Sequence, residues 1–207
     1  MGKLEDNKKR KKEALFHTAF ELFTTKGINK TAVSDIVDRA GVAKGTFYLY
    51  FKDKYDIRNK LITHKANELF GMASASVEKA ALNDFEDKVI YIVDFIIDQL
   101  TKNPPLMNFI AKNLSWGVFK TALSQPADEG GSIFYDKFME MIQNDSHHYD
   151  HPDIMLFTIV ELTSATCFPT ILEASPVTIG EFKPYLHRAI RAIPVSYTHL
   201  DVYKRQS

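Results

Sequence analysis

The stretch KGTFYLYF, which begins at Lys44, places several hydrogen-bond donors on one short segment. Lys44 supplies a positive charge, and the hydroxyl groups of Thr46, Tyr48 and Tyr50 can donate to phosphate oxygens. The Thr46 methyl group can also touch a thymine methyl group, and Gly45 leaves room for close approach of the backbone. Together these residue types suit binding to a nucleic acid.

Three short helices must position these donors. Apolar residues recur at three- and four-residue spacing over residues 11–26, which predicts an amphipathic helix. A second helix is predicted to follow Thr31, whose hydroxyl group offers an N-cap, and Gly41 ends it. In the third segment Phe47 and Phe51 are four residues apart and can point inward together. The pattern predicts a trihelical helix-turn-helix.

The stretch TAVSDIVDRAGVAKGTFYLYFKDKYDI resembles the DNA-binding signature of the TetR/AcrR family, and the resemblance covers residues 11 to about 60. It implies that the Thr at the start of the second helix contacts the DNA backbone, and that K-G-T-F-Y-x-Y-F is the recognition helix. It also implies a phosphate contact by the Lys of F-x-x-K. Ala43 departs from the family pattern, in which many members have a capping Ser. The DNA-binding residues implied are Thr31, Lys44, Gly45, Thr46, Tyr48, Tyr50 and Lys54.

The formal net charge of zero conceals an asymmetry along the chain. Residues 1–60 hold 14 basic and 8 acidic residues, a balance of +6, whereas the remainder holds 12 and 18, a balance of −6. This split favours a polyanionic partner for the N-terminal part. Within it, the run KKRKK at residues 8–12 is either a flexible arm that reaches phosphate or the minor groove, or a solvated run of charge.

The pattern of the rest of the chain predicts helices, so the predicted fold class is all-α. A helix-turn-helix domain is followed by a helical domain for ligand binding and dimerisation. Asp53 is the predicted N-cap of a fourth helix, which joins the two regions. Thr178 and Glu181 form a capping box at the start of the last helix. Further helices are predicted at 84–102, 105–121, 129–144, 152–172 and 178–193.

The predicted domain limits are 1–53 for the helix-turn-helix and 54–193 for the helical domain. Residues 194–207 form a non-native tail in this interpretation, because SYTHLDVYKRQS resembles a string found at the ends of unrelated translated sequences. The segment 154–172 is apolar nearly all the way round, so it must be covered on more than one side. A partner subunit would provide that cover.

Aromatic and methionine side chains of the second region suit a pocket for a small apolar or aromatic ligand, although they would equally fill a core. The predicted ligand-binding residues are Met107, Phe109, Trp116, Phe138 and Met139. No metal site is predicted, because the three His residues at 147, 148 and 151 lack a fixed helical spacing. Cys167 is predicted to be a buried thiol.

These observations predict a cytoplasmic, homodimeric DNA-binding regulator of transcription, a ligand-responsive repressor that binds a palindromic operator in double-stranded DNA. Neither a cofactor nor a membrane partner is expected. An enzyme is not expected either, because the sequence holds no nucleophile elbow, phosphate-binding Gly-rich loop or HExxH motif. The alternatives are an activator or a ligand-independent regulator of the same fold, and a protein that binds membrane surfaces through its basic arm.

Overall fold

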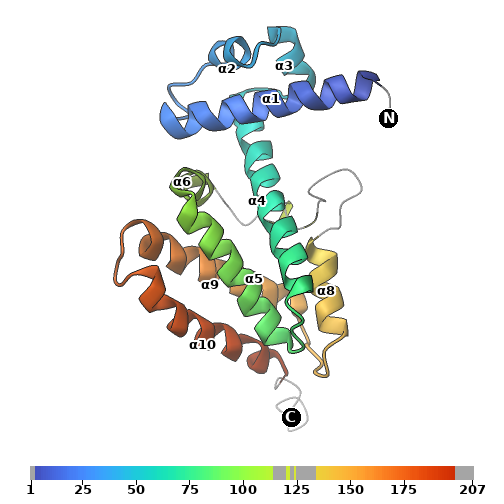
Figure 1. Cartoon of the computed structure of the whole chain (residues 1–207), viewed down its shortest axis with the longest axis vertical. Helices are drawn as coiled ribbons and strands as arrows, with labels where there is room; N and C mark the ends of the chain where they lie inside the picture. Colours follow the sequence, from blue (N-terminus) through green and yellow to red (C-terminus); the bar gives the residue numbers. More distant parts are fainter. Residues whose placement is uncertain (1–2, 114–119, 122–123, 125–133, 199–207) are drawn as a thin grey trace, which may run out of the picture. The chain divides into compact units, whose positions relative to one another are not determined.

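The computed structural model describes residues 3–113, 120–121, 124 and 134–198, and within these ranges it contains helices and no strands. This confirms the all-α prediction. The helices, shown in Figure 1, are α1 (Lys3–Thr25), α2 (Val33–Ala40), α3 (Lys44–Tyr50), α4 (Lys54–Lys79), α5 (Phe85–Lys102), α6 (Pro104–Asn113), α8 (Phe134–Gln143), α9 (Pro152–Leu172) and α10 (Ile179–Thr198).

The chain divides into two compact units. The N-terminal unit comprises Met1–Ala66 and Asn108–Thr121, and the C-terminal unit comprises Asn67–Met107 and Ala122–Ser207. Both α4 and α6 therefore contribute residues to each unit. The functional limits of 1–53 and 54–193 stay predictions.

The N-terminal unit is built on the apolar face of α1. Leu15 and Ala19 are completely buried, and they pack in one cluster with Ile36 of α2 and Phe47 of α3. α6 adds Phe109, whose ring lies edge-on to Phe20 and is stacked on Phe23. The ribbons of α2 and α3 lie on the same side of α1 (Figure 1). The periodic apolar residues of α1 pack against both helices in this cluster.

The turn between α2 and α3 depends on a left-handed residue. Gly41 has φ 66°, and its amide donates to the Asp38 carbonyl while the next amide, of Val42, donates to Val37. A residue with a side chain is strained in this conformation, so glycine suits it. The predicted helix end at Gly41 is confirmed.

Two predicted caps are confirmed and one is wrong. The carboxylate of Asp53 accepts bonds from the Tyr55 and Asp56 amides at 2.7 and 2.8 Å, which caps α4. Thr178 and Glu181 form their reciprocal box at the start of α10. Thr31 is not the N-cap of α2, because Ala32 occupies that position and its amide donates to the Asp35 carboxylate at 3.1 Å.

The C-terminal unit packs α10 against α9 and α5. Side chains of α10 contact acidic residues of α5 along its length: Lys183 with Asp98 at 2.6 Å, His187 with Asp94 at 2.9 Å and Arg191 with Asp87 at 2.6 Å. α10 also extends beyond the predicted end at residue 193, and Pro194 within it is buried. The sequence-based end was too early, but the origin of residues 194–207 stays a prediction.

Helix α9 is the most apolar element that the structure describes. By length and composition it is the one helix within the described residues that could cross a membrane, with a mean hydropathy of 1.6 over its apolar window. Only 28% of that window is buried inside the chain. Met155 and Ile159 face the core, whereas Ile154 and Phe157 are exposed. Part of this apolar surface is therefore exposed among the described residues.

Candidate nucleic-acid interface

Helix α3 separates an apolar face from an exposed one, as predicted. Phe47 is completely buried and Phe51, just beyond the helix, is 2% exposed, with ring centroids 5.4 Å apart. On the other side Tyr48 is 53% exposed and Leu49 is 79% exposed. Lys44 is exposed at the start of the helix. The buried phenylalanines fix the helix, so that its outer face is held out to solvent.

Gly45 lies on this exposed face. Apart from its two neighbouring residues and the nearby backbone of its own helix, a Cβ atom built at this position would meet no atom within 4 Å, and its φ is not left-handed. The fold therefore does not require glycine here. The lack of a side chain leaves the backbone open to solvent, and the approach of a partner at Gly45 stays a prediction.

Tyr50 and Thr46 are less exposed than Tyr48. The Tyr50 hydroxyl group donates to the carbonyl oxygen of Lys8 in α1 at 3.3 Å, and Thr46 is half-buried. Tyr50 is therefore turned toward α1, and its phosphate contact stays a prediction. Sequence reasoning missed this pairing, because the two residues are 42 positions apart.

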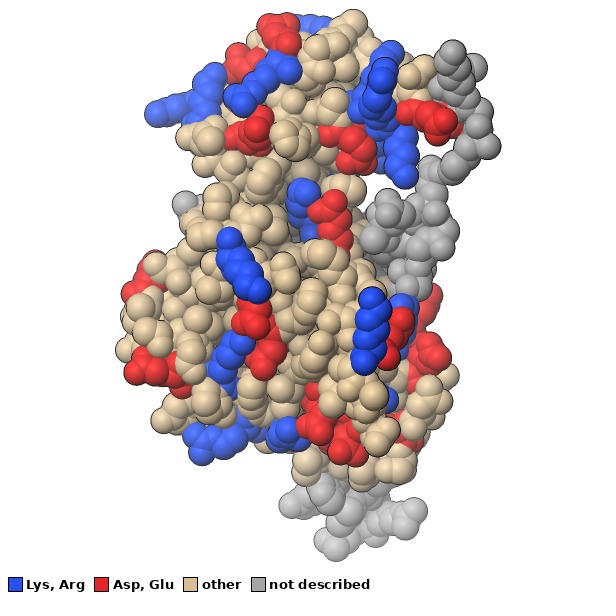
Figure 2. All heavy atoms as spheres, in the orientation of Figure 1, with Lys and Arg blue, Asp and Glu red and all other residues tan. Residues whose placement is uncertain are grey.

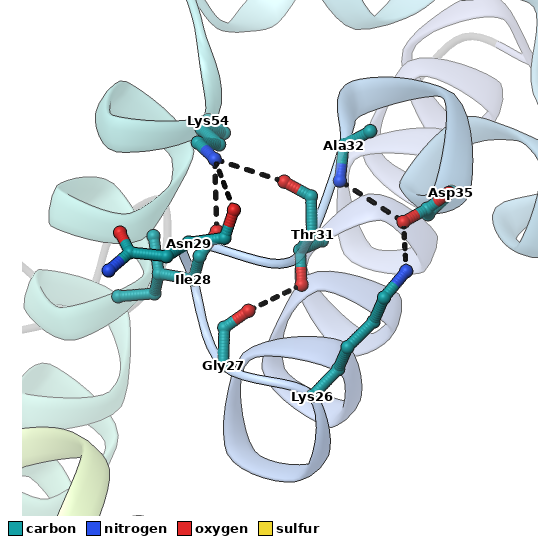
Figure 3. Close-up of polar contacts among 8 residues, drawn as sticks. All are labelled: Lys26, Gly27, Ile28, Asn29, Thr31, Ala32, Asp35 and Lys54. Carbon is teal, nitrogen blue, oxygen red and sulfur yellow. Dashed lines mark hydrogen bonds and ion pairs between the residues drawn. The ribbon is translucent and has the colours of Figure 1, made fainter.

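Thr31 has a structural position in this protein. Its side chain is 1% exposed, and its hydroxyl group donates to the Gly27 carbonyl at 2.8 Å (Figure 3). That bond closes the turn between α1 and α2. A contact between the Thr31 hydroxyl group and DNA would require this bond to break, and the contact stays a prediction.

Lys54 ties the start of α4 to the same turn. Its ammonium group donates to the carbonyl oxygens of Ile28 at 3.0 Å, Asn29 at 3.2 Å and Thr31 at 3.2 Å (Figure 3). An ammonium group has three donors, so all of them are engaged here. In the protein alone Lys54 thus holds a loop, and the predicted phosphate contact has not been tested.

An ion pair beside this turn was not foreseen from the sequence. The Lys26 ammonium group donates to the Asp35 carboxylate at 2.5 Å, and the same carboxylate accepts the Ala32 amide (Figure 3). The Lys26 bond first, and then the Ala32 bond, lower the pKa of Asp35. The sequence did carry a signal for the Ala32 bond, because Asp35 stands three residues after the N-cap, at the N3 position of a capping box.

The basic run at residues 8–12 is not a flexible arm. It lies within α1, which begins at Lys3, and residues 5–13 are all exposed. The two acidic residues in the first turn, Glu5 and Asp6, favour a helix start here. A helical basic segment therefore stands beside α3, joined to it by the bond from Tyr50 to Lys8.

The predicted ligand-binding residues that the structure describes do not all belong to one unit. Phe109 belongs to the core of the N-terminal unit, and Phe138 packs against Phe85 in the C-terminal unit. Met107 is buried and Met139 is half-buried. Trp116 lies outside the described residues. Phe109 is thus a core residue of the helix-turn-helix, while the ligand pocket itself remains untested.

Comparison with known proteins supports the interpretation of the N-terminal unit. Residues 12–61 match the family model described as bacterial regulatory proteins, tetR family. Over 65 residues the chain is 42% identical to the HTH-type transcriptional regulator YvdT of Bacillus subtilis, which is 30% of this chain and 34% of that protein. The chain thus matches about a third of the length of this curated relative.

Solved structures share the fold over nearly the whole chain. The fatty acid degradation regulator FadR of Bacillus halodurans has a TM-score of 0.62 at 20% identity, covering 87% of this chain and 94% of that one. FadR of Bacillus subtilis, solved in complex with stearoyl-CoA, has a TM-score of 0.60 at 15% identity, covering 86% and 96%. At these identities the likeness concerns the fold alone.

Proposed function

We propose that the chain is a DNA-binding transcriptional regulator, a ligand-responsive repressor of the tetR family, whose family model residues 12–61 match. The single observation that carries the proposal is the construction of α3. Phe47 is buried on the inner face of this helix, while Lys44, Gly45 and Tyr48 lie on its exposed face and offer donors and open backbone. Such a helix can enter the major groove, which is about 12 Å wide.

Helix α9 supports assembly as a homodimer. Its exposed apolar residues Ile154 and Phe157 would be covered by the same helix of a second subunit. A dimer would present two recognition helices, and these bind successive major grooves about 34 Å apart on a palindromic operator. Phe157→Glu should shift the protein toward monomer in sedimentation velocity, whereas Met72→Glu, at an exposed apolar residue of α4, should not. Equal effects of the two changes would argue against α9 as the interface.

The C-terminal unit would hold the inducer. A ligand acts on DNA binding only through a difference in its affinity for two conformers. Helix α4, which contributes to both units, offers a covalent route for such a difference. Stearoyl-CoA is a suitable first probe, since the B. subtilis FadR structure contains it. The chain has a single Trp, Trp116, so quenching of its fluorescence would report binding near one predicted pocket residue.

The test of the proposed function is a selection of genomic DNA fragments with the purified protein, followed by salt titrations on the best fragment. We expect a palindromic site, an affinity that falls steeply with salt, and loss of binding in Lys44→Ala and Tyr48→Ala. Weak binding without sequence preference would overturn operator recognition. Binding to anionic vesicles in its place would favour the membrane-surface alternative.

A further inference from the structure

The basic run Lys8–Lys12 is the strongest charged feature that the recognition helix leaves unused. Its five side chains are all basic and all exposed. Figure 2 shows Lys and Arg side chains on both sides of the N-terminal unit, with acidic side chains among them. Like charges four residues apart, such as Lys8 and Lys12, repel one another and weaken an isolated helix by about 0.2–0.5 kcal/mol per pair. A polyanion beside the run would relieve that repulsion.

The position of the run is fixed by contacts with the end of the recognition helix. The Tyr50 hydroxyl group donates to the Lys8 carbonyl, and Lys60 donates to the Tyr50 carbonyl at 3.0 Å. The Lys12 ammonium group lies 5.6 Å from the centre of the Phe16 ring, which itself lies 5.3 Å from the Phe51 ring. The basic run is therefore held beside α3, on the same unit as the proposed DNA-binding face.

We propose that the basic run of α1 is a second DNA-binding surface, which binds backbone phosphates beside the groove that α3 enters. This inference rests on the proposed function. Because the run is helical, with a diameter of about 10–12 Å including side chains, the helix cannot enter a minor groove about 6 Å wide. It binds phosphates from outside the groove. Such contacts add affinity and salt dependence, whereas the sequence preference comes from α3.

The test compares two variants with equal loss of charge. The first variant combines Lys8→Gln, Lys9→Gln and Lys11→Gln. It keeps Lys12, whose ammonium group lies over the Phe16 ring. The control variant combines Lys79→Gln, Lys88→Gln and Lys102→Gln. It removes three charges from the parts of α4 and α5 that belong to the C-terminal unit. Gln is a good helix former, so helix content should hold and can be checked by circular dichroism.

The probe is a duplex of about 40 base pairs, long enough for two half-sites with flanking DNA on either side. It is selected from a random-sequence library with the wild-type protein. For each variant the slope of log K against log salt concentration is measured. We expect the slope to fall by at least about 0.9 per protomer in the α1 variant and to hold in the control, with an unchanged preferred sequence. Hydroxyl-radical footprints should lose protection beside the α3 site only in the α1 variant.

Two results would overturn the inference. One is a slope in the α1 variant equal to that of the control, and the other is loss of binding to vesicles of anionic lipid while the DNA slope is unchanged. If the wild-type protein selects no sequence at all, the proposed function fails. If it selects a site and the α1 variant binds that site with the wild-type slope, only this inference fails.

Discussion

The ammonium group of Lys54 lies 3.0 Å from the carbonyl oxygen of Ile28, so the first residue of α4 is fastened to the turn between α1 and α2. Two further carbonyl oxygens of that turn, those of Asn29 and Thr31, take up the remaining donors. The start of α4 and the entry to α2 are thereby held as one piece. Any movement of this end of α4 would carry the helix-turn-helix with it.

This arrangement predicts a particular signature for Lys54→Met. The change removes the charge but keeps most of the stem, so it should destabilise the protein by about 1–3 kcal/mol and lower the melting temperature. If Lys54 acts only by holding this turn, DNA affinity should fall while the slope of log K against log salt is unchanged. Lys44→Met, in contrast, should lower the slope by about 0.9 per protomer. A slope that falls equally at Lys54 would establish the phosphate contact that the family resemblance implies.

The burial of Phe47 predicts a large cost for its truncation. Phe47→Ala should destabilise the protein by about 3–5 kcal/mol, because it leaves a cavity in the core of the N-terminal unit. Leu49→Ala, two residues along the same helix, should change the free energy of unfolding by less than about 0.5 kcal/mol, since Leu49 is exposed. Chemical denaturation of both variants measures the difference. Equal costs would show that α3 presents another face inward.

The ion pair of Lys26 with Asp35 predicts a pH dependence. The folded-state pKa of Asp35 is lowered by the bonds from Lys26 and Ala32, so its contribution to stability is present above 3.8, the ordinary carboxyl value. That contribution is lost as the pH falls through the lower folded value. The melting temperatures of wild type and Asp35→Asn should therefore differ at pH 6 and converge below about pH 3.8. Asp38→Asn, at an exposed residue of α2, is the control, and a constant difference for Asp35→Asn would contradict the prediction.

The thiol of Cys167 should be inert in the native protein. Burial raises its pKa to about 11, so little thiolate forms at neutral pH. A disulfide reagent at pH 8 should react slowly with native protein and release one equivalent per chain in denaturant, since the chain has a single Cys. Rapid reaction of the native protein would show that α9 opens or that the thiol is accessible.

Local patterns in the sequence determined most of the fold. The spacing of Leu15, Ala19 and Phe47 with Phe51 specified which faces are buried, because an apolar face must find a core. Gly41 specified the turn, since few other residues tolerate its φ of 66°. Helix starts at Asp53 and Thr178 were likewise readable from short-range capping chemistry.

The tertiary structure decided the roles of individual polar groups. Tyr50 is hydrogen-bonded to Lys8, and Lys54 is hydrogen-bonded to the turn at residues 28–31. In each case the partners are more than 20 positions apart in the sequence, so no local pattern predicts the bond. Phe109 looked like a pocket residue, yet α6 delivers it to the core of the N-terminal unit. Periodicity predicts which face of a helix is apolar, but the element that covers that face depends on the path of the whole chain.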